Sequence, residues 1–155
     1  MSMPEFTPEF KTREDGLVAV EQCAREILEQ LSEERLEQIK TDTGRKFAQQ
    51  IRDRAEAASH ATEWDNEQAA AFTAQARQAH DSFRAGVEAG AGETWEEIDW
   101  QRMPHDWQRC ISDCVNRAIT CTEQCFDSED PIICEAWCLL CFDLCLIFCS
   151  PVWGW

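Results

Sequence analysis

Apolar residues recur three or four positions apart through the N-terminal half of the chain, the spacing of one face of an α-helix. The first such run begins at Thr12, which forms a capping-box-like Thr-x-x-Asp pattern with Asp15. Its apolar positions are Leu17, Val20, Ala24, Ile27, Leu28 and Leu31. The run predicts an amphipathic helix that buries one face.

Two more runs of the same period follow. The second holds Leu36, Ile39, Phe47, Ala48, Ile51 and Ala55, and we expect any break in it at Asp42-Thr43-Gly44. Asp65 with Gln68 predicts the cap of the third, which holds Ala69, Phe72, Ala76, Ala79, Phe83 and Val87. All three runs are rich in Glu, Gln, Arg and Ala, which are good helix formers.

The C-terminal part predicts a helical hairpin of different character. Pro104 opens a helix that runs to about Phe126, a turn follows, and Asp130 with Pro131 caps a second helix that ends near Cys149. The second helix is apolar on nearly all sides, with Glu135 and Asp143 as its only charges, so it is buried or lies in lipid. Two carboxylates are costly in a bilayer, so we expect burial beneath the N-terminal helices, with membrane contact less favoured.

The chain therefore predicts an all-α helical bundle of about five helices, with no strand-like alternation of any length. Five regions are expected: an extended arm (1–11), an acidic amphipathic helical region (12–92), a linker bearing tryptophans (93–103), a Cys-rich helical hairpin (104–149) and a Trp-containing tail (150–155). We expect the linker tryptophans to seal an edge of the core. The tail, with Trp153 and Trp155, either folds back onto the core or docks a partner.

Nine of the ten cysteines lie in the hairpin, and eight of them are spaced as a mirror image. The steps are 4, 7 and 4 residues on the first helix and again 4, 7 and 4 on the second, reflected about Ser128 and Glu129. Steps of four and seven keep residues on one helix face, so the fold-back places sulfur opposite sulfur. The eight are Cys110, Cys114, Cys121, Cys125, Cys134, Cys138, Cys145 and Cys149.

The favoured interpretation of this row is a non-enzymatic thiolate site for a soft metal ion, Cu(I) before Zn(II). Structural zinc sites commonly use C-x2-C knuckles, so C-x3-C steps on helices favour Cu(I). The row resembles the Cys-lined helices of bacterial copper-storage four-helix bundles, and this resemblance implies Cu(I) inside a bundle. The N-terminal helices depart from that family, because they carry only Cys23. High capacity would then require hairpins to pair in a homo-oligomer.

The alternative interpretation is a disulfide-zipped hairpin without a metal cofactor, in an interaction protein or a secreted, membrane-active one. The spacing also resembles the twin C-x3-C hairpins of mitochondrial intermembrane chaperones and plant α-hairpinins. That resemblance implies the bridges 110–149, 114–145, 121–138 and 125–134, and leaves Cys23 and Cys141 for a fifth bridge. Strict mirror symmetry favours bridges, because disulfides need register whereas a soft-metal store needs only many sulfurs nearby.

The net charge of the chain and its expected cellular compartment further limit the possible classes of function. A net charge of −16 argues against nucleic-acid binding, which requires basic patches. The N-terminus lacks the basic and apolar regions of a secretory signal, so we expect a cytoplasmic protein, with export by another route left open. A reducing compartment favours metal over disulfides.

Weaker interpretations remain. The cysteines could simply permit close packing, or the C-terminus could be the core of a Cys-rich precursor peptide with a helical leader. We expect no enzyme, because His60, His80 and His105 are scattered and are expected to be solvated or capping. The C-x-x-C of Cys138 and Cys141 lies within a predicted helix, without the βαβ setting of redox motifs.

Overall fold

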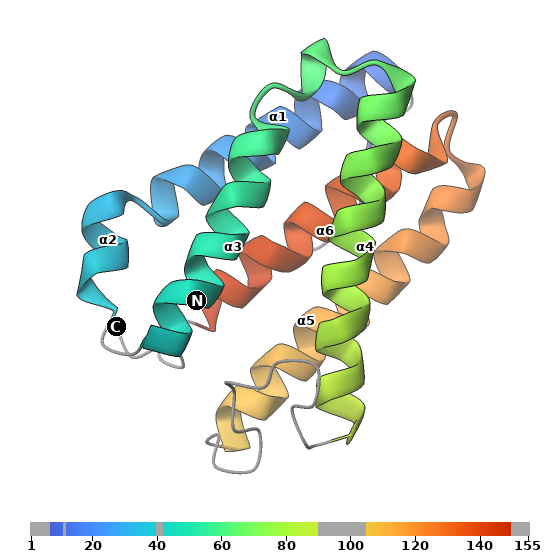
Figure 1. Cartoon of the computed structure of the whole chain (residues 1–155). Helices are drawn as coiled ribbons and strands as arrows, with labels where there is room; N and C mark the ends of the chain where they lie inside the picture. The colour runs from blue at the N-terminus through green and yellow to red at the C-terminus, as the bar shows by residue number, and fades with distance from the viewer. Residues whose placement is uncertain (1–6, 11, 40–41, 90–104, 150–155) are drawn as a thin grey trace.

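The structure is a computed structural model that describes residues 7–10, 12–39, 42–89 and 105–149. These residues form six α-helices and two short 3-10 helices, without a strand among them. In chain order the elements are α1 (Arg13–Gln30), α2 (Glu33–Gln38), α3 (Asp42–Ala58), η1 (Ala61–Glu63), α4 (Asn66–Ala89), α5 (His105–Gln124), η2 (Cys125–Asp127) and α6 (Pro131–Phe148) (Figure 1). The all-α prediction is confirmed. The predicted linker 93–103 and tail 150–155 lie outside the described residues.

The helix starts follow the capping chemistry of the sequence. Thr12 Oγ1 accepts a hydrogen bond from the Asp15 amide at 3.1 Å. Asp65 and Gln68 form a reciprocal capping box, in which each side chain accepts from the other's backbone amide at 2.8 and 3.0 Å. At α6, Asp130 accepts from the Ile133 amide and Pro131 occupies the first turn. All three predicted caps are confirmed.

The second amphipathic run breaks earlier than predicted. Ser32 starts a separate helix, α2, because its hydroxyl accepts a hydrogen bond from the Arg35 amide and its backbone is extended. The chain leaves α2 at Ile39, and Asp42 already belongs to α3. Our expectation of a break at Asp42-Thr43-Gly44 is therefore wrong. The break in this run falls between Ile39 and Asp42, whereas the Ser32 cap separates α2 from α1.

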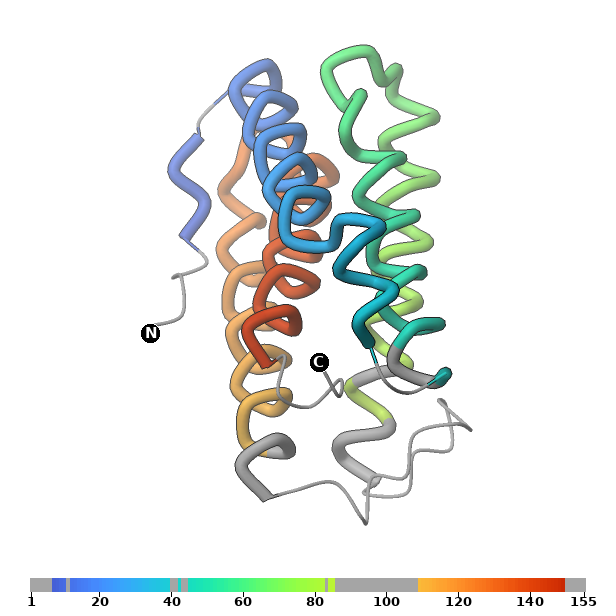
Figure 2. Tube along the Cα trace, turned by 90° about the vertical axis from the view of Figure 1, so that its left-hand side faces the viewer, coloured from blue at the N-terminus to red at the C-terminus, as the bar shows by residue number. Residues whose placement is uncertain are grey.

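Helix α6 forms the centre of the molecule. It packs against α1, α4 and α5, and runs side by side with α5 in both views (Figures 1 and 2). Most of its residues, from Ile133 to Ile147, are buried. It is the one described helix long and apolar enough to cross a membrane, but 72% of that stretch is buried within the molecule. Its apolar character on all sides is thus accounted for by helices packed around it.

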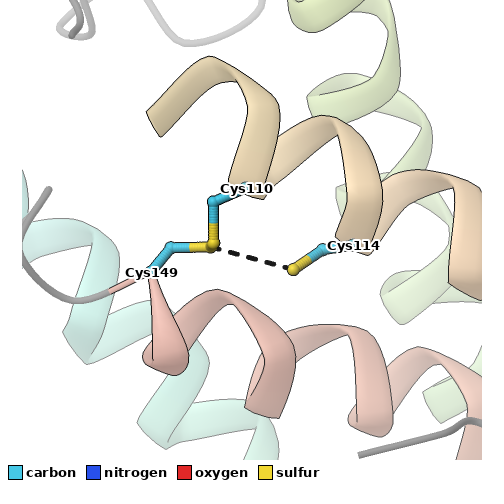
Figure 3. A group of neighbouring side chains, drawn as sticks. All are labelled: Cys110, Cys114 and Cys149. Carbon is cyan, nitrogen blue, oxygen red and sulfur yellow. Dashed lines mark hydrogen bonds between the residues drawn. A yellow bond between two sulfur atoms is a disulfide. The ribbon is translucent and has the colours of Figure 1, made fainter. Parts of the chain in front are cut away.

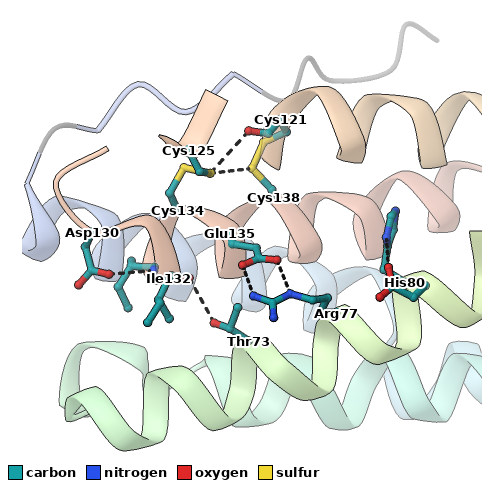
Figure 4. Close-up of polar contacts among 12 residues, drawn as sticks. Thr73, Arg77, His80, Cys121, Cys125, Asp130, Ile132, Cys134, Glu135 and Cys138 are labelled. Carbon is teal, nitrogen blue, oxygen red and sulfur yellow. Dashed lines mark hydrogen bonds and ion pairs between the residues drawn. A yellow bond between two sulfur atoms is a disulfide. The ribbon is translucent and has the colours of Figure 1, made fainter. Parts of the chain in front are cut away.

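Both carboxylates of α6 are neutralised by arginines. Arg54 of α3 donates two hydrogen bonds to Asp143, at 3.0 and 2.9 Å. Arg77 of α4 donates two to Glu135, at 2.6 and 2.5 Å (Figure 4). Burial alone would lower the pKa of Arg54, but the Asp143 carboxylate outweighs it and the pKa is raised. Paired, bidentate contacts make a buried charge tolerable in the core helix.

Candidate functional site

Helices α5 and α6 run antiparallel and bring the mirror-spaced cysteines into register as four disulfides. The Cα atoms of the bridged residues lie 5.6 to 6.0 Å apart, in the usual range for this bond. The bridges are Cys110–Cys149, Cys114–Cys145, Cys121–Cys138 and Cys125–Cys134. We call these four bridges the ladder. This is the pairing implied by the twin C-x3-C resemblance, so the alternative interpretation, a disulfide-bonded helical hairpin, is confirmed. The thiolate site for a soft metal, which the sequence analysis favoured, stays a prediction.

Small side chains allow the two helices to approach this closely. Ala118, midway between the second and third bridges on α5, is fully buried, as are Cys114 and Cys121 on either side of it. A larger residue at position 118 would hold the helix axes further apart than a disulfide can span. At the closed end the chain tightens into η2, which carries Cys125 to its partner across a short turn.

Sulfurs of neighbouring bridges also contact each other. The Sγ atoms of Cys114 and Cys149 lie 3.8 Å apart (Figure 3), and those of Cys125 and Cys138 lie 3.7 Å apart (Figure 4). Each contact completes a group of three sulfurs within 4.8 Å of one another, the first including Cys110 and the second Cys134. Because the thiolate is the metal ligand, these groups offer a metal site only when the bridges are reduced.

Cys23 and Cys141 stand outside the ladder. Both are buried thiols, one on α1 and the other on α6. Hydrogen bonding to Cys23 and burial together raise the pKa of Cys141, and the negative charges of Glu26 and Asp143 raise it further. The structure therefore brings together the two residues that we expected to form a fifth bridge, and leaves them as thiols.

A cavity of about 390 Å³ opens onto this thiol pair. Its wall comes from the N-terminal arm, α1 and α6, and comprises Thr7, Glu9, Phe10, Ala19, Gln22, Cys23, Glu26, Trp137, Cys141 and Leu144. We call it the dithiol cavity. Sequence reasoning missed it, because it depends on how residues 7–10 lie over the α1–α6 contact, and no periodicity reports that.

The described histidines divide between surface and core. His60 is exposed, as expected. His80 is only 6% exposed, so our expectation of a solvated or capping residue is wrong. It packs edge-on against Phe142, with ring centroids 4.7 Å apart, because α4 turns this position toward α6. Its Nε2 atom has no hydrogen-bond partner among the residues that the structure describes, and burial lowers the pKa of His80. The side chain of His105 lies outside the described residues.

Fold and site together define a Cys-rich, disulfide-bonded all-α bundle. Comparison with protein-family profiles, curated proteins and solved structures finds no match to this chain. The function must therefore be argued from the chemistry of the ladder and the dithiol cavity.

Proposed function

We propose that this protein is a non-enzymatic binding protein of an oxidising compartment, and that the ladder makes its hairpin a rigid scaffold. The observation that carries the proposal is the register of four consecutive bridges between two helices. Bridges require each cysteine to face one particular partner, whereas loosely held soft metal ions need only many sulfurs nearby. The mirror spacing meets the stricter requirement at all four positions.

The bridges favour an oxidising compartment over the cytoplasm expected from the N-terminus. Disulfides persist outside reducing compartments, and cytosolic proteins seldom keep several structural bridges. A rigid, strongly acidic bundle is suited to bind a positively charged partner. The same charge repels nucleic acids and anionic membrane surfaces.

The test is the denatured mass of protein purified from an oxidising compartment, combined with thiol counting by alkylation. We expect a mass about 8 Da below that of the fully reduced chain, from two hydrogens lost at each of four bridges. Two thiols should react with the alkylating reagent in unreduced, denatured protein, and ten after reduction. Ten reactive thiols without reduction would contradict the proposal.

A second candidate function is favoured by the two three-sulfur groups of the ladder. In a reducing compartment the same eight cysteines would be thiols, and sulfurs already within 4.8 Å of one another could share Cu(I). Reduced protein should then bind Cu(I) in a Cys23→Ser/Cys141→Ser background, where only the ladder contributes thiols. Adding Cys125→Ser and Cys138→Ser, which lie in one three-sulfur group, should lower the number of ions bound. An unchanged number would exclude those two residues as ligands.

A further inference from the structure

The two free cysteines form the one pair of thiols that the ladder leaves unused. Cys23 and Cys141 come from different helices, are each 7% exposed and line the same cavity. Their pairing depends on the packing of α1 against α6, the core contact of the bundle. Two thiols held together by the tertiary fold are a preformed pair of soft ligands.

The dithiol cavity gives this pair a route to solvent. Although each thiol is nearly covered, both lie on the wall of the cavity, between the arm, α1 and α6. A small ion can therefore reach sulfurs that a folded protein partner cannot contact. Trp137, Phe10 and Leu144 form the apolar part of the wall and limit the water around the sulfurs.

The charged residues around Cys23 and Cys141 determine which kind of ligand the dithiol cavity can bind. Among the described residues that line the cavity, the charged ones are Glu9 and Glu26, and both are acidic. Asp143, two residues further along α6, adds a negative charge near Cys141 and is itself paired with Arg54. The surroundings therefore disfavour two bare thiolates and anionic oxidants such as glutathione disulfide, and they favour a cation that takes up the thiolate charge.

We propose that Cys23 and Cys141 form a two-thiolate site for a single Cu(I) ion in the protein whose ladder is bridged. The proposal rests on the proposed function, since it requires the other eight cysteines to be in disulfides. On binding, each thiol releases its proton to solvent and each sulfur forms one bond to the ion, with no change in oxidation state. Zn(II) fits poorly, because it prefers four protein or water ligands.

The experiment uses oxidised, full-length protein under anaerobic conditions, with Cu(I) supplied as its complex with bicinchoninate, a coloured chelator. We expect the protein to withdraw one equivalent of Cu(I) per chain from the chelator. Cys23→Ser and Cys141→Ala should each abolish this transfer. Gln22→Ala, which alters the same cavity wall without touching a sulfur, should retain it. Thermal unfolding followed by circular dichroism verifies that each variant is folded.

Denatured mass separates failure of this site from failure of the ladder. A loss of about 8 Da with two free thiols but no Cu(I) withdrawn overturns the dithiol site and leaves the ladder intact. A loss of about 10 Da with no free thiol shows a fifth bridge at Cys23–Cys141, and also overturns the site. A mass without any loss overturns both proposals. Transfer that persists in both cysteine variants places the ion elsewhere and contradicts the assignment.

Discussion

The buried ion pair between Arg54 and Asp143 is the residue-level contact on which the core helix most depends. The Asp143 side chain is 4% exposed, so removing its partner leaves an uncompensated charge in the core. We expect Arg54→Met to lower the free energy of unfolding by about 3–5 kcal/mol. The double variant Arg54→Met/Asp143→Leu should recover most of that loss, because it removes both charges. Urea unfolding of the oxidised protein measures both effects.

Arg77 is the matched control for this prediction. It makes the same two-bonded contact to Glu135, but its side chain is 51% exposed. Solvent screens such a pair, so we expect Arg77→Met to cost about 1 kcal/mol or less. Equal losses for the two arginines would show that burial does not set the cost here.

His80 predicts a pH dependence of stability. Burial lowers its pKa in the folded protein, with Asp81, Arg84 and Asp143 as its charged neighbours, whereas the unfolded chain has a pKa near 6.5. Below about pH 6.5 the unfolded state therefore binds a proton that folded His80 does not. Stability should fall as pH decreases through this range, by up to about 1.4 kcal/mol per unit.

The comparison of His80→Gln with the parent protein isolates this effect. A glutamine does not titrate. The free energy of unfolding, measured in urea between about pH 7.5 and about pH 5, should therefore fall less steeply with decreasing pH for the variant. His60→Gln, at an exposed position, should keep the parent's slope. Parallel curves for His80→Gln and the parent would contradict the assignment of a lowered pKa.

At the level of elements, the nested arrangement of the bridges determines what each contributes. Their sequence separations range from 9 to 39 residues, and isolated bridges would differ in stabilisation accordingly. In the ladder, however, each pair of neighbouring bridges closes a small ring of chain. Removing the outermost bridge opens one such ring, and removing an inner bridge merges two, while the remaining bridges still hold the helices together. Chain entropy then gives about 2 kcal/mol for the outermost bridge and about 2 kcal/mol for Cys121–Cys138.

Paired alanine variants test this expectation. Cys110→Ala/Cys149→Ala and Cys121→Ala/Cys138→Ala should lower the free energy of unfolding by similar amounts in urea, with the other three bridges verified by mass. A loss at the outer bridge larger by about 2 kcal/mol or more would mean that the ladder does not act as a nested set.

Gly16 lies where α1 packs tightly against α6 and the Phe10 ring. A Cβ atom at this position would lie 2.9 Å from Ile133 Cγ2 and 3.1 Å from the Phe10 ring. In an open helix interior Gly→Ala adds up to about 1 kcal/mol of stability. Here we expect Gly16→Ala to destabilise the fold instead, because a β-branched neighbour cannot move aside easily. A higher melting temperature for Gly16→Ala would show that the α1–α6 contact is looser than described.

The sequence predicted those elements whose signals are local or symmetric. The hairpin and the register of its cysteines could be predicted from the helical period, the mirror spacing and the helix caps at Thr12, Asp65 and Asp130. The spacing could not distinguish bridges from thiolates, because both need sulfurs on facing helix faces. The short helix α2 was missed, since its Leu36 and the following Ile39 keep the same apolar period as the residues of α3. The dithiol cavity and the burial of His80 depend on how the helices pack together, and the helical repeat of apolar residues does not report that packing.

For the whole molecule, the high net charge is an unfavourable feature of the folded state. A charge of −16 on a chain of 155 residues repels itself when the molecule is compact. Raising the salt concentration from about 0.01 M to about 0.15 M shortens the screening length from about 30 Å to about 8 Å, which is less than the width of a small domain. Exposed ion pairs lose strength as well, but each contributes about 1 kcal/mol or less. We therefore expect the melting temperature of the oxidised protein to rise by several degrees with added NaCl.

Variants of three exposed glutamates test whether the salt effect arises from charge repulsion. Glu29, Glu37 and Glu123 lie in the last turns of α1, α2 and α5, where a negative charge also opposes the helix dipole. Replacing all three with Gln should raise the melting temperature at low salt and reduce the further gain on adding NaCl. Glu14→Gln, in the first turn of α1 where a negative charge is favourable, should not raise it. If the triple variant gains as much from salt as the parent does, then self-repulsion among these charges does not limit stability.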